Sequence, residues 1–245
     1  MKADVPMPIL DHLAELRRRV IWSLVGLVVA SVAAFAFYDV IVRFLLRPFE
    51  GLDPAAGANT VYVTTVIEGF STRIRVSLLC GVILSLPVHM ASIVLFVFPG
   101  LTGRERRIVG SALVAGLLLV IGSATFGYAA VIPISIRFLM TSRFVPDGVG
   151  IILSLQRNIA YLFQFLLATL IVFEIPIVLA LLMAFGVVSR RALLRASRYV
   201  IVGIAVLSAV LTPPDLISQV TLAVPLIALY FLTIGVAKVF GFGNE

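Results

Sequence analysis

Glu174 is the side chain best placed to do chemistry, because it stands inside an apolar run from Asn158 to Val188. As a helix, that run exceeds the roughly 30 Å of hydrocarbon in a bilayer. An ionised carboxylate at such depth costs on the order of 3 kcal/mol or more, so residues of this kind usually serve a function. The alternative is a protonated Glu174 that hydrogen-bonds a carbonyl freed by a kink at Pro176. The residues alone leave both interpretations open.

Two other acidic residues stand among arginines. Glu15 lies one helical turn from Arg18 and Arg19, where a local ion pair is the simplest interpretation. Glu105 is the single acid in a polar turn that carries three arginines, a pattern typical of a solvated loop.

The remaining polar residues argue against an enzyme. The two histidines, His12 and His89, are far apart in the chain and do not have metal-ligand spacing. We interpret His89, one turn after Ser85, as a packing contact. The sequence has neither a phosphate-binding Gly-Lys-Ser/Thr loop nor a Gly-x-Ser-x-Gly turn, and the single Cys80 cannot form an intramolecular disulfide. We therefore predict no catalytic residues, no cofactor and no metal.

Composition indicates the class of protein. The 245 residues are 61% hydrophobic and only 13% charged, which is typical of a helical membrane bundle. The net charge of +7 comes from basic residues in short loops between apolar runs. That distribution controls membrane topology and argues against nucleic-acid binding.

The apolar runs predict an all-α membrane protein, with a single polytopic domain over residues 1–245. Its six transmembrane helices are expected at residues 20–38, 70–98, 108–132, 158–188, 199–211 and 218–237. The last two are short, since 13 residues make a helix of only about 20 Å. Pro213 and Pro214 end the fifth span. A re-entrant hairpin that never crosses the membrane is the alternative for this pair.

Lysine and arginine predict the orientation of the chain. Of the 19 basic residues, twelve lie in one set of connectors and seven in the opposite set. The excess places both termini in the cytoplasm, as an even number of spans requires. We do not expect the first apolar segment to be cleaved, because it is longer than an ordinary signal sequence core.

An ordered set of short motifs resembles the TatC family. They cover nearly the whole chain: His12-Leu13-x-Glu15-Leu16-Arg17-x-Arg19, Arg47-Pro48, Phe96-x-x-Pro99-Gly100-Leu101, Glu105-Arg106-Arg107, Phe173-Glu174-Ile175-Pro176 and Leu211-Thr212-Pro213-Pro214-Asp215-x-x-Ser218-Gln219. Each motif is weak alone, whereas the ordered set is specific. The chain departs from the family pattern at Ala91, Ser92 and Val94, where the family usually carries aromatic and glutamine residues.

The resemblance implies a concave, glove-like bundle in the cytoplasmic (inner) membrane that acts as the receptor of the twin-arginine translocase. This machine exports folded proteins with the proton-motive force. The implied signal-peptide-binding residues are Glu15, Arg17, Arg19, Phe96 and Glu105. Glu174 is implied to lie in an intramembrane polar cavity, and Pro48, Asp215 and Gln219 to contact partners on the extracytoplasmic side.

The implied partners are twin-arginine signal peptides, single-span subunits of the TatA/TatB type, further copies of the chain and the lipid bilayer. The chemistry is consistent with this, because a carboxylate can hold a planar guanidinium through two charge-assisted hydrogen bonds. The rival hypothesis is a small proton- or ion-coupled transporter that uses Glu174. Such a transporter would show matching broken helices in both halves, and Pro176 has no clear counterpart in the first three spans.

Overall fold

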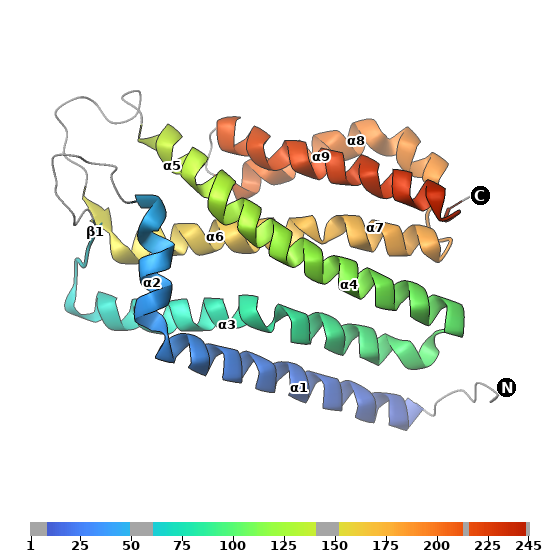
Figure 1. Cartoon of the computed structure of the whole chain (residues 1–245), viewed down its shortest axis with the longest axis horizontal. Coiled ribbons are helices and arrows are strands. Elements are labelled where there is room, and N and C mark those ends of the chain that lie inside the picture. Colours follow the sequence, from blue (N-terminus) through green and yellow to red (C-terminus); the bar gives the residue numbers. More distant parts are fainter. Residues whose placement is uncertain (1–8, 50–60, 141–151, 213–215, 244–245) are drawn as a thin grey trace.

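The computed structural model describes residues 9–49, 61–140, 152–212 and 216–243. Nearly all of them are helical (Figure 1). The helices are α1 (Ile9–Ala36), α2 (Tyr38–Leu46), α3 (Val66–Val97), α4 (Gly103–Phe126), α5 (Ile132–Leu139), α6 (Leu155–Phe173), α7 (Ile175–Ala184), α8 (Arg190–Leu211) and α9 (Leu216–Val239). Short 3-10 turns η1 (Arg47–Phe49) and η2 (Phe98–Gly100), the π-helical turn η3 (Gly127–Val131) and two strands, β1 (Val61–Tyr62) and β2 (Leu153–Ser154), complete the described chain.

Six helical stretches of the described chain are long and apolar enough to cross a bilayer, which confirms the predicted fold class. The stretches are Leu10–Ala36, Val66–Gly100, Gly103–Leu139, Leu155–Ala184, Arg190–Leu211 and Leu216–Val239. The first, third and fifth stretches are each longer than predicted, and α8 has 22 residues because its helix continues upstream through a basic segment. The predicted span 199–211 is therefore the C-terminal, apolar part of a longer helix.

The core of the bundle centres on α6. Ile159, Leu162, Phe163 and Phe165 of this helix are at most 2% exposed, and they pack with Val76 of α3 and residues of α2 and α5. The other helices keep apolar side chains exposed on their outer faces, as expected of surfaces that lie against lipid. The π-helical turn η3 joins α4 to α5, so that residues 103–139 form one continuous helical stretch.

Helix α1 packs mainly on α3, through small residues. A Cβ added to Gly81 would lie 2.9 Å from Ser31 Cα and 2.0 Å from Ser31 Oγ. Gly26 approaches Val88 in the same way, with 3.0 Å between an added Cβ and Val88 Cγ1. Small residues let helix backbones come close together in a membrane, where dispersion contacts have to replace the hydrophobic effect.

The two ends of the bundle differ. Helix α1 begins, α4 begins and α9 ends at one end, called here the terminal end (Figure 1). At the opposite end, the loop end, β1 and β2 form a parallel pair with Val61 opposite Leu153. Glu68 stabilises the loop end through its carboxylate. The carboxylate accepts hydrogen bonds from Thr64 and Thr65, directly before α3, and from Ser154 Oγ and the Gln156 amide at the start of α6.

Candidate functional site

Glu15 lies at the terminal end on α1, where it forms an ion pair within its own helix. Its Oε1 is 2.5 Å from Arg19 Nη2 and accepts a hydrogen bond from Arg19 Nε at 2.6 Å. This is the local pair that the spacing allowed, and the structure selects Arg19 as the partner. Glu15 also lines an open groove of about 450 Å³ beside Asp11 and Arg17. The carboxylate thus holds a guanidinium at a solvent-facing surface.

Phe96 belongs to the same part of the surface. Its ring stacks on the His12 ring with 4.4 Å between the centroids and 26° between the planes. This contact joins the first turns of α1 to the end of α3, so the structure brings Glu15 and Phe96 together through His12. Arg17 is exposed on α1 and lies along the groove.

Glu105 lies in the first turn of α4 and is part of a capping box. Its Oε2 accepts hydrogen bonds from Thr102 N and Thr102 Oγ1, both at 2.8 Å, and its own amide donates to Thr102 Oγ1 at 3.4 Å. These contacts satisfy amides that the start of a helix leaves unpaired. Among the described residues, no cation forms an ion pair with Glu105, although it lines a cavity of about 380 Å³ with Arg104.

Glu15 and Glu105 therefore share the terminal end of the bundle but line different cavities. The cavity of Glu105 is closed on its other side by the turn between α7 and α8 and by Phe242 and Gly243 near the C-terminus. A ligand that touches both carboxylates has to cross the surface around the end of α3, where His12 and Phe96 stack. This geometry suits an extended peptide better than a small molecule.

Glu174 lies at the break between α6 and α7, where the predicted kink occurs. Its side chain points toward α4: an added Cβ on Gly116 would be 3.0 Å from Glu174 Oε2 and 2.6 Å from Met90 Cε. Glu174 Oε1 is buried and has no hydrogen-bond partner among the described residues. An unpaired buried carboxylate oxygen is costly, and an oxygen that capped a freed carbonyl at the kink would show such a bond.

The three predicted partner-contact residues fall at different places. Pro48 is half-buried in η1, next to the buried Phe49. Gln219 is on α9, and its Nε2 donates to Ala205 O of α8 at 3.0 Å, which ties the last two helices together. Asp215 lies outside the described residues.

Sequence reasoning missed several polar contacts that the structure contains. The spacing Thr-x-x-Glu, typical of a capping box, occurs at both Thr65–Glu68 and Thr102–Glu105 and could have identified both caps. The bond between Ser23 Oγ and His89 Nδ1, at 2.8 Å, joins α1 to α3 across 66 residues. Sequence has no local signal for a contact at that separation.

Comparisons with known proteins agree on one family. The family described as Sec-independent protein translocase protein (TatC) matches residues 11–225. A TatC protein of Carboxydothermus hydrogenoformans is 31% identical over 96% of this chain and 94% of its own length, and one of Synechocystis is 33% identical over 97% and 91%. Among solved structures, a crystal structure of the twin arginine translocase receptor TatC is similar at a TM-score of 0.77. It is 31% identical over 92% of this chain and 98% of that one.

The family match reaches from the first membrane-spanning stretch into the sixth, and the comparisons give no support to the secondary-transporter alternative. A matching family model over most of the chain, two relatives above 30% identity and a full-length structural match all point the same way. The chain belongs to the TatC family and is a multi-pass core subunit of the Sec-independent, twin-arginine protein translocase.

Proposed function

We propose that this protein is the receptor for twin-arginine signal peptides, and that Glu15 and Glu105 each bind one guanidinium group of the peptide. The observation that carries this proposal is the placement of both carboxylates at the terminal end of the bundle, where the Phe96–His12 stack joins α1 to the end of α3. The similar crystal structure is that of a twin arginine translocase receptor, which supports the proposal.

Arg19 has a specific part in this proposal. In the free protein the Arg19 guanidinium is paired with the Glu15 carboxylate. When the peptide binds, one of its arginines replaces Arg19 in this pair. The pair joins two residues one turn apart on the same helix, and such pairs contribute only about 0.3–0.5 kcal/mol, so the exchange costs little. Arg17 lines the groove and guides the backbone of the peptide, while Phe96 supplies an apolar contact next to the charged groups.

A peptide with paired arginines, compared with a twin-lysine peptide of otherwise identical sequence, tests the proposal. We expect the twin-arginine peptide to bind the purified protein more tightly, because lysine cannot form the two parallel hydrogen bonds of a guanidinium. Fluorescence anisotropy of labelled peptides measures the difference. Equal affinity for the two peptides would contradict recognition through guanidinium–carboxylate pairs.

The proposed setting is the cytoplasmic (inner) membrane, with both termini in the cytoplasm and the loop end outside. In this setting we expect Pro48 and Gln219, together with Asp215 outside the described residues, to contact single-span TatA/TatB-type subunits or further copies of the chain. The start of α1 and the end of α9 lie at the same end of the bundle, as an even number of crossings requires (Figure 1).

Reporter fusions test this orientation. An enzyme reporter that is active only outside the cytoplasm should be active after Asp53, Asp147 or Asp215, three positions outside the described residues. The same reporter should be inactive after Gly103 or Glu245. The physical basis is the excess of arginine and lysine in the terminal-end connectors. Activity after Glu245 would refute the proposed orientation.

Glu174 is proposed to line an intramembrane polar cavity that opens to water. Glu174→Gln should then fold normally and reduce transport, because the amide still hydrogen-bonds but cannot be charged. Insertion and thermal stability report folding, and export of a folded reporter substrate measures transport.

A thiol-labelling experiment separates the cavity from a capped kink. In a Cys80→Ser background, Glu174→Cys should react with a small water-soluble thiol reagent, whereas Thr169→Cys, a fully buried position, should not. Full export by Glu174→Gln together with an unreactive cysteine at position 174 would leave Glu174 with only a structural role.

A further inference from the structure

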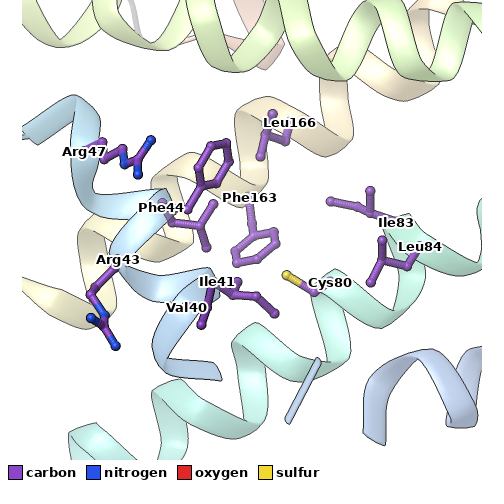
Figure 2. Close-up of a pocket in the computed structure, with 11 residues that line it drawn as sticks. Val40, Ile41, Arg43, Phe44, Arg47, Cys80, Ile83, Leu84, Phe163 and Leu166 are labelled. Carbon is purple, nitrogen blue, oxygen red and sulfur yellow. The ribbon is translucent and has the colours of Figure 1, made fainter. Parts of the chain in front are cut away.

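A deep apolar groove lies beneath α2 at the loop end of the bundle (Figure 2). Its volume is about 590 Å³, within the roughly 300–1,000 Å³ of typical ligand sites. The walls are apolar on all three sides: Ile41 and Phe44 from α2, Cys80 and Leu84 from α3, and Phe163 from α6 are among the lining residues.

Helix α2 makes one end of the groove charged, whereas the rest of the groove is apolar. This helix crosses the bundle at a steep angle to α1 and α3 (Figure 1), and α1 ends directly before it. Short amphipathic helices with this arrangement lie in the plane of the membrane interface. At this interface, Arg43 and Arg47 form the rim of the groove.

Among the residues that the structure describes, the two rim arginines have no partner of opposite charge. Arg43 Nε donates to Asp39 O at 3.2 Å, and the Arg47 guanidinium lies 5.7 Å from the centroid of the Phe44 ring. Phe44 is itself fixed, because its ring stacks on Tyr128 and its carbonyl accepts a hydrogen bond from the Tyr128 hydroxyl. Both arginine side chains are exposed, and neither forms an ion pair with any described residue.

The other end of the groove reaches the middle of the membrane. Figure 2 places Arg43 and Arg47 on one side and Ile83 and Leu84 on the other, with Phe163 and Cys80 between them. Leu84 lies about 27 Å along α3 from Val66, past the midpoint of this 32-residue helix. The groove is therefore cationic at the interface and apolar down to the bilayer centre.

We propose that this groove binds an anionic phospholipid, with its phosphate between Arg43 and Arg47 and an acyl chain along Phe163, Cys80 and Leu84. Guanidinium groups bind phosphate through paired, charge-assisted hydrogen bonds, and basic pockets between transmembrane helices bind lipid head groups. An apolar partner helix fits less well, because it would leave the Arg43 and Arg47 guanidinium groups at the rim without an anion.

Native mass spectrometry of the full-length protein tests the proposal with phosphatidylglycerol and phosphatidylcholine of identical acyl chains. We expect phosphatidylglycerol to be retained preferentially. The variant Arg43→Gln/Arg47→Gln should bind it about 25-fold more weakly, since each arginine near an anionic lipid contributes about fivefold. Arg137→Gln removes an exposed arginine of α5 outside the groove and should leave binding unchanged.

Two further measurements locate the lipid. A phosphatidylglycerol with a photoreactive group in its acyl chain should cross-link to α3 near Leu84, and Leu84→Trp, which fills the groove from its exposed edge, should abolish the adduct. Equal retention by the double arginine variant would overturn the proposal, as would displacement of the lipid by inorganic phosphate. A Cys80–Cys80 disulfide between copies would show instead that a second chain occupies the groove.

Discussion

Replacing both Glu15 and Glu105 with glutamine is expected to weaken binding of a twin-arginine peptide by a factor on the order of several hundred. Each substitution removes one charge-assisted pair with a guanidinium, and each loss alone should be tens-fold. The glutamine at position 105 keeps the shape of the side chain and can still cap α4, because the capping box accepts Gln as well as Glu. The change in affinity therefore reports charge and leaves the helix start intact. Photo-cross-linking or anisotropy with a labelled peptide measures it.

Two controls make this result specific. Asp39→Asn removes an exposed carboxylate at the loop end and should leave peptide binding unchanged. The double glutamine variant should lose less affinity for a twin-lysine peptide than for the twin-arginine peptide, because lysine does not form the paired hydrogen bonds of a guanidinium with a carboxylate. Retention of wild-type affinity for the twin-arginine peptide in the double variant would rule out Glu15 and Glu105 as the receptor site.

The Gly81→Ala variant is expected to destabilise the packing of α1 on α3 by about 1–3 kcal/mol. The added Cβ would lie 2.9 Å from both Cα and Cβ of Ser31, and the backbone of α1 has to move away to relieve the clash. Because α1 packs on few other elements, it cannot gain compensating contacts elsewhere. Trp22, the single tryptophan, lies on α1 and reports its displacement by fluorescence.

Gly122→Ala provides the matched control, because it makes the same change on α4 at a position where an added Cβ meets no atom within 4 Å. In a helix this change should be neutral or slightly stabilising. Melting curves of both variants in the same detergent give the comparison. Equal melting temperatures for Gly81→Ala and Gly122→Ala would show that the α1–α3 contact relaxes without cost.

The fold class and the family could both be predicted from the amino-acid sequence. Six apolar runs, each long enough to cross a bilayer, could be recognised locally, because the requirement to bury backbone hydrogen bonds in lipid leaves helices as the main solution. The break at Glu174 was equally local, since Pro176 cannot donate a backbone hydrogen bond. The ordered motifs then sufficed to identify the family.

The predicted ends of the helices were less accurate than the predicted number of spans, for a physical reason. Hydropathy marks where a chain is apolar, whereas a helix continues for as long as its backbone is capped or solvated. Helix α8 thus begins at Arg190, where Ser189 caps it, although the apolar stretch begins later. Likewise α3 begins after Thr65, which forms a capping box with Glu68.

Contacts between side chains of different helices could be identified only from the folded structure. Local spacing allowed Glu15 to pair with Arg18 or Arg19, and the structure contains the pair with Arg19. The stack of His12 on Phe96 and the groove beneath α2 both join segments distant in the chain. Such contacts depend on how closely two helices approach one another. That distance is set by the size of side chains at single positions such as Gly81. Patterns of hydropathy and charge along the sequence do not show it.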